Sequence, residues 1–450
     1  EVDAVEVGNI PVPVVCVLTL RTWIRAIATR KYGHHIPLFL KDGSKIVSQK
    51  GSKQGDALSN LYFSVYYKYI VDEIRVKYKL FSLCFCDDHY IAGRLDEVAK
   101  LFKEIKSALA SAGTVFCLSK CHVHHHPKCE VDLVSLFGDD TINYHPHYNF
   151  EILGGFIGTD QFIRSEIDKL VKEIGDLQTK VTNLDDVQCS MLAMKYSAGV
   201  QRITHILRTT HPDIISKQIE TFDLKLIQSV DDIIGQKSTA IQIERLALPI
   251  KQTGHGIGTA TDTAQPAYLA SYAEARTFID KYAAASGLAI DCSSSDRIHF
   301  DLQCRFIAHN DIAIDADGWT YSKYPNQHQL TQHVHARNRR NLEGSFTTNS
   351  ERVSFVTALA DGAGAWISAI PNNSTKRMSS EQYRVAFWRR YSYPIFNGHP
   401  QCIDCDGSLD VKGDHALHCG KYGGWTARHD ELRDVLFSWT QRGNMLVERE

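Results

Sequence analysis

Apolar and polar positions along this chain repeat with periods that predict strands mixed with helices, followed by a long helical region. From Ala57 to about Lys77, and again from Leu95 to Leu109, apolar side chains recur every three or four residues, as on one face of a helix. The second helix is expected to end near Gly113. Short apolar runs of strand length precede or separate these helices: IPLFL and SKIVSQ around the turn at 41–43, then FSLCFC at 81–86 and HYIAG at 89–93.

After ILGGFIG (152–158) the pattern becomes helical. Between Ile163 and Val181 apolar residues alternate by four and three, which is the clearest amphipathic helix of the chain. Further helical stretches are expected at about 186–208, 213–234, 267–286, 351–360 and 428–439. A stretch rich in Pro, Gly and His (394–400) then precedes a small Cys/His segment at 402–419.

Composition narrows the class of protein. Of the 450 residues, 43% are hydrophobic and 23% charged, so wholesale disorder is excluded. No apolar run reaches the ~18–20 residues of a membrane span, which excludes a transmembrane protein. The chain starts with Glu1 rather than Met and ends at Glu450 without a polar tail, so we expect a fragment of a longer protein.

Charge and cysteine content add two limits. Lys and Arg total 50 against 52 Asp and Glu, and this net charge of -2 excludes a globally basic surface but not a local basic cleft. The 12 cysteines are not preceded by a signal sequence, so we expect reduced thiols in an intracellular protein.

Asp87 and Asp88 form a carboxylate pair between two apolar runs of strand length. Like charges so close together repel, and a divalent cation is their usual compensator. Mg²⁺ prefers one or two carboxylates together with water and phosphate oxygens, as at a nucleotidyl-transfer site. FCDD (85–88) therefore indicates a metal-binding hairpin.

The surroundings of this pair resemble the palm of reverse transcriptases. GSKQGDALS (51–59) lies upstream of FCDD, and a segment from Gly113 to Lys120 lies downstream. The family shows the same order: a QGxxLS-type loop, a long helix, an xxDD hairpin and a glycine-to-lysine segment. Further similarity to non-LTR retrotransposon polymerases lies in these segments: RKY (30–32) followed by PLFLKDG, LG (153–154), IG (157–158), LALPIKQTGHGIG (246–258), AYLAS (267–271) and FWRRY (387–391).

This resemblance implies roles for individual residues. Asp87 and Asp88 would hold Mg²⁺ or Mn²⁺, which binds the incoming dNTP and activates the primer 3′-hydroxyl. Gln54 and Gly55 would shape the loop under the templating base, where glycine allows close backbone approach. Lys120 would face the phosphates as a cation or a proton donor.

The sequence departs from the family pattern in two places. Phe85, expected on the template-binding side of the hairpin, and Cys86 stand where the family usually carries Tyr and a small residue such as Ala, which weakens the expected fit against the primer. The family's first metal ligand is an Asp on a strand upstream of the Gln-Gly loop, and nothing in residues 1–30 matches it; Asp3 is the only acid in a remotely similar place. Without that carboxylate part of the charge that holds the cation is gone, so we expect a severely impaired site.

A second carboxylate pair, FGDD (137–140), resembles the GDD hairpin of viral RNA-dependent RNA polymerases. Its spacing from Gln54 and Gly55 is too long for that role, and NYHPH follows it instead of an apolar strand. FCDD is therefore preferred as the catalytic pair.

Cys402, Cys405, His415 and Cys419 have the C-x2-C-x9-H-x3-C spacing of a tetrahedral zinc site. His418 is an alternative to His415, and a small core of thiols without metal is the alternative to zinc. GDHALHC and the following RHDELRD resemble the zinc knuckle that follows the polymerase in retrotransposons with a restriction-like endonuclease. That nuclease would lie downstream, so Asp430, Glu431 and Glu448 are not expected to be catalytic.

Two other groups are weighed as functional. CHVHHHPKC (121–129) crowds His and Cys without the paired spacing of a metal site, so we expect a solvated loop rather than a metal centre. Lys169, Lys172, Arg202 and Arg208 in the helical region either follow a phosphate backbone or form a charged, solvated face.

We therefore predict an α+β fold: a partial right-hand polymerase with a reverse-transcriptase palm, a mainly helical thumb and connector, and a zinc knuckle. The expected boundaries are 1–150 for partial fingers and palm, 151–240 for the thumb, 241–399 for the connector, and 400–450 for the knuckle and the start of a truncated endonuclease region. The resemblance implies an RNA-directed DNA polymerase for target-primed reverse transcription, with Mg²⁺ and Zn²⁺, acting on an RNA template, a DNA primer in a nicked target and dNTPs, in the nucleus. The alternatives are a non-catalytic, nucleic-acid-binding remnant of the same element and a structural protein without nucleic-acid contact.

Overall fold

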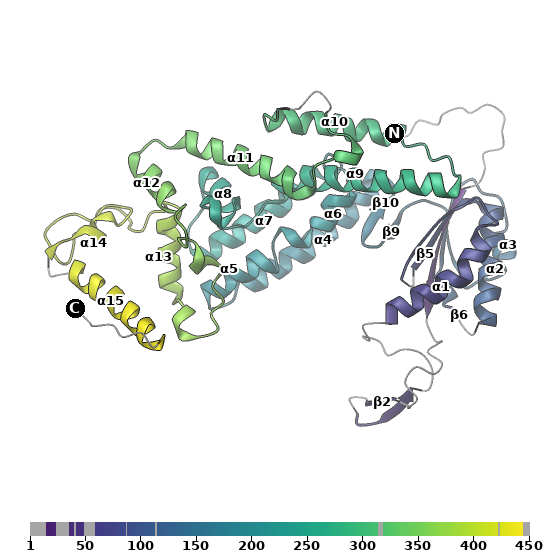
Figure 1. Ribbon diagram of the computed structural model, residues 1–450, viewed down its shortest axis with the longest axis horizontal. Coiled ribbons are helices and arrows are strands. Elements are labelled where there is room, and N and C mark those ends of the chain that lie inside the picture. Colours follow the sequence, from purple (N-terminus) through teal and green to yellow (C-terminus); the bar gives the residue numbers. More distant parts are fainter. Residues whose placement is uncertain are drawn as a thin grey trace. The chain divides into compact units, whose positions relative to one another are not determined.

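The computed structural model describes residues 15–23, 36–39, 42–48, 59–86, 88–112, 115–313, 318–421 and 424–443 (Figure 1). The chain forms two compact units. The first consists of Glu1–Ile163 together with Glu274–Arg297, and the second of Arg164–Ala273 together with Ile298–Glu450. The fold is α+β and mostly helical, as the sequence predicts.

The first unit is built on a sheet with the strand order β4-β5-β1-β7-β8, and the short β6 also pairs with β1. The strands are β1 (Val15–Trp23), β4 (Phe81–Phe85), β5 (Asp88–Arg94), β6 (Val115–Phe116), β7 (His122–His125) and β8 (Asn143–His145). Only the β7–β8 pair is parallel among these described strands. The central β1 falls in a segment that the periodicity analysis did not assign to any element.

Two further hairpins belong to the first unit. β2 (Ile36–Phe39) pairs with β3 (Lys45–Ser48), which confirms the two strands predicted around the turn at 41–43. β9 (Phe150–Ile152) pairs with β10 (Gly155–Ile157).

Helices pack against one face of the large sheet: α1 (Ser59–Arg75), α2 (Leu95–Ser111) and α3 (Leu133–Phe137). Leu18, Ile91 and Val123, from three neighbouring strands, are fully buried against Phe102 and Ile105 of α2. Burial of each such side chain contributes roughly 1.5–3 kcal/mol to the hydrophobic driving force. Because side chains alternate along a strand, the residues next to these core positions belong to the opposite face of the sheet.

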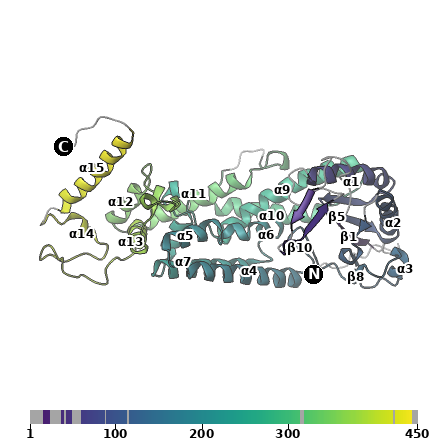
Figure 2. The same ribbon diagram turned by 90° about the horizontal axis from the view of Figure 1, so that it is seen from below.

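The second unit is helical. Its helices, some of which begin or end in the first unit, are α4 (Asp160–Thr182), α5 (Val187–Tyr196), α6 (Thr204–Thr209), α7 (Ser216–Ile234), α8 (Ala240–Ala247), α9 (Ala260–Ser286), α10 (Ser293–His309), α11 (Gln327–Ser345), α12 (Asn349–Thr357), α13 (Ser380–Arg390), α14 (Asp414–His418) and α15 (Gly424–Arg442). The helices predicted at 163–181, 213–234, 267–286, 351–360 and 428–439 are confirmed with shifted ends. The stretch predicted at 186–208 is divided between α5 and α6, and α8, α10, α11 and α13 were not predicted. α4 and α7 lie side by side (Figure 2), and Gln218 Nε2 donates to Asp168 Oδ1 across them at 3.0 Å.

Two sequence segments that carry the family resemblance meet in the second unit. His255 of LALPIKQTGHGIG is 1% exposed, and its Nδ1 lies 3.0 Å from the hydroxyl of Tyr391 of FWRRY. Arg390 donates to the carbonyl oxygen of Ala363 at 3.1 Å and to that of Ile250 at 3.4 Å. These two segments therefore stabilise one packed region, which is a structural reason for their residue choice.

Candidate functional site

The predicted carboxylate hairpin forms between β4 and β5. Phe85 and Asp88 are the last paired residues of these antiparallel strands, so the connection is a two-residue turn. Cys86, the first turn residue, has φ 53°, as the favoured hairpin turns require. A non-glycine residue in this conformation costs roughly 1–2 kcal/mol. Asp87, the other turn residue, lies outside the described residues.

Asp88 begins β5 on the face opposite the helices, because His89 and Ile91 of the same strand are buried on the helix side. The Tyr90 hydroxyl donates to Asp88 Oδ2 at 3.3 Å. In the register with β1, Asp88 pairs with Arg21. β1 reads VCVLTLRTW and contains neither Asp nor Glu, so the strand next to β5 supplies no second carboxylate.

The other predicted catalytic residue, Lys120, lies across β1 from Asp88. It is exposed and ends a 3₁₀ turn (Leu118–Lys120) that connects β6 to β7. β6 pairs with β1 at Thr22 and β7 pairs with it at Thr19, so this turn and Asp88 flank the same level of β1. β5 and β7 lie on either side of β1, so two strand spacings, about 10 Å, separate them.

Of the remaining predicted residues of this site, the structure describes Phe85 alone. Phe85 is 57% exposed at the hairpin tip, where a bound strand could reach it. Gln54 and Gly55 lie outside the described residues. The structure thus brings Asp88, Phe85 and the Lys120 turn to one end of the sheet.

The second carboxylate pair is not a hairpin. α3 ends at Phe137, and Gly138, with φ 75°, caps it in the left-handed conformation. Asp139 accepts hydrogen bonds from Thr141 and forms an ion pair with Lys106 at 3.2 Å. The Thr141 hydrogen bonds are the main cause that lowers the pKa of Asp139. This segment therefore closes a helix and a turn.

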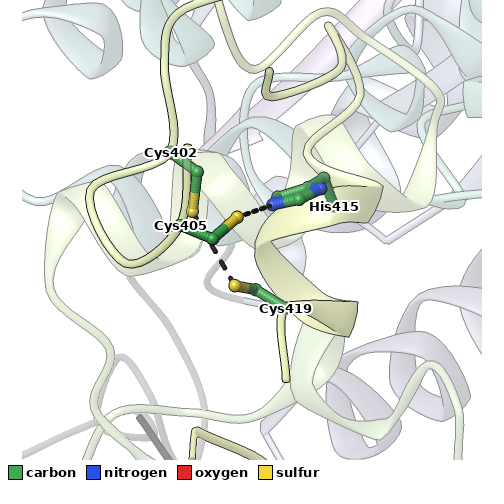
Figure 3. A group of neighbouring side chains, drawn as sticks. All are labelled: Cys402, Cys405, His415 and Cys419. Atoms are coloured by element: carbon green, nitrogen blue, oxygen red, sulfur yellow. Dashed lines mark hydrogen bonds between the residues drawn. The ribbon is translucent and has the colours of Figure 1, made fainter. Parts of the chain in front are cut away.

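The four predicted zinc ligands converge in the second unit (Figure 3). One ligand atom from each of Cys402, Cys405, His415 and Cys419 lies within 4.8 Å of the others. Cys402 Sγ is 3.9 Å from Cys419 Sγ, and Cys405 Sγ is 3.2 Å from His415 Nε2. Zn–S bonds of ~2.3 Å in a tetrahedron place two sulfurs about 3.8 Å apart, so the donor spacing fits such an ion.

Local backbone contacts position these ligands. The Cys402 N–H donates to the carbonyl oxygen of Gly407 at 2.8 Å, which closes the turn between the first two cysteines. Asp410 accepts N–H groups at the start of α14, including that of His415 at 2.6 Å. A Cβ on Gly407 would lie 3.0 Å from His415 Cε1 and 3.2 Å from Cys405 Sγ. Glycine here lets the backbone approach the ligand cluster closely.

The electrostatics of Cys402 also fit a metal ligand. Backbone N–H groups of Asp404 and Cys405 lower the pKa of Cys402 to about 7, which favours the thiolate that binds metals. His418, the alternative ligand, is exposed, and its Nδ1 instead hydrogen-bonds the carbonyl oxygen of Asp414 at 2.8 Å. The Cys₃His group can therefore hold a metal ion through His415.

The crowded histidines at 121–129 are not in a solvated loop, so that expectation was wrong. Residues His122–His125 form β7, in which His124 and His125 are buried. Cys121 is fully buried in the core of the first unit and Cys129 packs against it. β-Sheet pairing with β1 and β8 outweighs the polarity of the segment.

Three of the four basic residues weighed in the helical region, Lys169, Arg202 and Arg208, have protein partners. Lys169 pairs with Glu166 at 2.6 Å, and Arg208 donates to Gln327 at 2.6 Å. Arg202 donates to the carbonyl oxygen of Ser197 at 2.7 Å. These contacts favour the interpretation of a solvated, internally paired face over a phosphate-binding track.

Comparison with protein-family models found no match, and comparison with curated proteins found none either. Among the helices of the described residues, none is both long enough and apolar enough to cross a membrane.

Proposed function

We propose that this chain is the polymerase part of a non-LTR retrotransposon protein, whose reaction is RNA-directed DNA synthesis on a primer. The observation that carries this proposal is the β4–β5 hairpin with the sequence FCDD at its turn, placed beside a central strand and backed by two helices. Asp88 directly follows a tight turn whose neighbour Phe85 is 57% exposed, so a primer end can approach it, and Mg²⁺ is the ion that carboxylates hold with phosphate oxygens. The nucleus is the compartment that this reaction implies.

The Cys₃His group supports the same proposal. We propose Zn²⁺ as its ion, because three thiolates and one imidazole in a tetrahedron form a closed structural zinc site. Such a module, after a helical region, corresponds to the knuckle of the retrotransposon family. It would contact the RNA or the target DNA.

A second function is favoured by one observation: β1 contains no carboxylate beside Asp88. A two-metal reaction needs carboxylates on more than the hairpin turn to hold its ions. The second candidate is therefore a protein that binds a primer–template without extending it.

The test is incorporation of dNTPs on an RNA template with a DNA primer in the presence of Mg²⁺. Synthesis that disappears in Asp87→Ala/Asp88→Ala would support the polymerase. Binding without synthesis would support the second candidate, and the bound fraction should fall steeply with salt. A chain without affinity for the primer–template at low salt would contradict both.

A gain of function separates the two candidates further. Thr19 and Arg21 of β1 pair with Tyr90 and Asp88, so a carboxylate at either position lies on the row next to the hairpin. If the missing ligand is the only defect, Thr19→Asp or Arg21→Asp should restore Mg²⁺-dependent incorporation. Leu20→Asp is the matched control, because position 20 alternates to the other face of the sheet.

A further inference from the structure

Four histidines gather on the sheet face opposite the helices of the first unit. His122 and His124 belong to β7, and since side chains alternate, both share the face that Val123 does not occupy. His145 of the parallel strand β8 pairs directly with His124. The ring centroids of His124 and His145 are 4.6 Å apart, and His147 follows at 5.5 Å from His145.

The ring nitrogens of these residues converge. One nitrogen from each of His122, His124 and His145 lies within 4.8 Å of the other two. His122 Nδ1 and His145 Nε2 are 3.0 Å apart. Two imidazole nitrogens bound to one Zn²⁺ at 2.0–2.1 Å would be about 3.4 Å apart, so small side-chain movements accommodate an ion.

A contact with the backbone determines which nitrogen of the His124 ring carries the hydrogen. His124 Nδ1 lies 3.2 Å from the carbonyl oxygen of His147. A carbonyl oxygen only accepts hydrogen bonds, so Nδ1 carries the hydrogen and the lone pair of this imidazole is on Nε2. An imidazole oriented by a hydrogen bond from its second nitrogen to a backbone carbonyl is the usual arrangement of a metal-binding histidine.

The surroundings separate the central ring of the group, that of His124, from bulk water. His124 is 5% exposed, and the ring of Phe150 covers it at a centroid distance of 4.6 Å. His122 and His145 are half-buried beside it, and the hydrogen bond between their rings holds the two side chains together. A cation among the three rings would accept one nitrogen lone pair from each of them.

We propose that His122, His124 and His145 form a second metal centre, with Zn²⁺ as its ion, distinct from the Cys₃His group. Imidazole donors suit Zn²⁺, Cu²⁺ and Ni²⁺ rather than Mg²⁺ or Ca²⁺. Three protein ligands leave the fourth position of a tetrahedron to water or to His147. The ion links β8, a strand of three residues, to β7 at the end of the sheet.

Zinc content of the full chain tests this centre. Wild type purified with Zn²⁺ and dialysed should hold two ions per chain, measured by elemental mass spectrometry. Cys405→Ser/Cys419→Ser and His122→Ala/His145→Ala should each hold one. In chelator competition the histidine variant should lose at least about 100-fold in affinity at its site, more than substitutions outside the ligand shell cause. His126→Ala is the matched control, because His126 is exposed at the end of the same strand.

A second measurement leaves the histidines intact. Co²⁺ added to Cys405→Ser/Cys419→Ser should give the visible d–d absorption of a tetrahedral ion without a thiolate charge-transfer band, and Zn²⁺ should displace it. No absorption in this variant would overturn the proposal. So would a wild type with a single zinc ion that the cysteine substitutions remove completely.

Discussion

Two buried histidines, one in each unit, should make the stability of the protein sensitive to acid. His89 is 1% exposed between the Tyr67 hydroxyl and Ser82 Oγ, both at 2.8 Å. His255 is equally buried beside Tyr391. Burial is the main cause that lowers the pKa of each imidazole to about 3, and nearby positive charges add to it. Both side chains are therefore neutral in the folded protein at neutral pH.

The free energy of unfolding should fall as the pH drops below the unfolded-state pKa of about 6.5. Between that value and the folded pKa of about 3, the unfolded chain binds one proton more per buried histidine. The expected loss is ~1.4 kcal/mol per pH unit for each of them. Urea unfolding, followed separately in each unit by hydrogen exchange, measures this slope. His255→Gln should flatten it in the second unit, whereas His429→Gln, an exposed histidine, serves as the control; equal slopes in wild type and His255→Gln would contradict the argument.

A single methyl group should weaken the Cys₃His site. Gly407→Ala places a Cβ against His415 and Cys405 at distances of 3.0 and 3.2 Å, so the ligands must move. We expect zinc affinity to fall about 10- to 100-fold, as when residues that orient ligands are changed. Gly420→Ala is the matched control, since a Cβ there meets no atom within 4 Å. Chelator competition measures both, and equal affinities would mean that the cluster does not hold the ion.

At the scale of elements, capping side chains define where the helices of the second unit begin. Asn326 accepts the N–H of Gln329 at 3.0 Å, and the Gln329 side chain accepts the N–H of Asn326 in return at 2.9 Å. This capping box starts α11, a helix with few buried residues along its 19 positions. The box satisfies backbone N–H groups of the first turn, which have no partner within the helix.

Asn326→Ala should therefore lower the free energy of unfolding by about 1 kcal/mol. Asn326→Gly should lower the free energy of unfolding by only a few tenths of a kcal/mol, because glycine is itself tolerated at the N-cap position. Thermal and urea unfolding of the full chain compare the two. A larger loss for Gly than for Ala would show that chain flexibility, and not the cap, determines the stability of α11.

Helices and strands could be predicted from the sequence where the spacing of apolar residues kept one period over many positions. They were predicted less well where that period was short or absent. The predicted helix at 163–181 is α4, because its buried side keeps strict helical spacing. The start of α9 at Ala260, earlier than predicted, depends on Asp223, which accepts the N–H groups of Ala260 and Thr261 at 2.6 and 2.9 Å. β1 was missed because its first four residues, VCVL, form a short apolar run that periodicity alone does not assign to a strand.

The two candidate metal sites show the same limit. Cys402 to Cys419 lie in one short segment, so spacing alone predicted the cluster, and the fold brings the same four residues together. His145 joins His122 and His124 only through the parallel pairing of β7 with β8, which spacing does not reveal. The alternation in HVH, which places two histidines on one side of β7, was the available signal.

For the whole molecule, a late segment of the chain completes the first unit. Tyr282 of α9 donates its hydroxyl to the Ser82 carbonyl oxygen at 3.3 Å and accepts the Ser82 N–H at 3.0 Å. Its ring packs on Phe81 at a centroid distance of 5.4 Å. β4 is the edge strand of the sheet, so this side chain occupies backbone groups that would otherwise be open to another strand.

Tyr282→Phe should keep the ring contact and remove both hydrogen bonds. We expect the first unit to lose about 1 kcal/mol, with faster amide exchange in β4 and an unchanged second unit. Tyr69→Phe, in which an exposed tyrosine of α1 is changed, is the matched control. Hydrogen exchange with peptide resolution measures the effect, and unaltered exchange at Ser82 would show that Tyr282 does not protect the edge.

The position of Tyr282 in the chain has a consequence for synthesis. All strands of the large sheet are translated before Ile163. Tyr282, which covers the edge of that sheet, is translated only after Arg164–Ala273 of the other unit. At about 5–20 residues per second, a nascent chain waits on the order of ten seconds with this edge unoccupied. Ribosome-bound chains of this protein should therefore depend on chaperones during that interval, and slower translation should lengthen their exposure to aggregation.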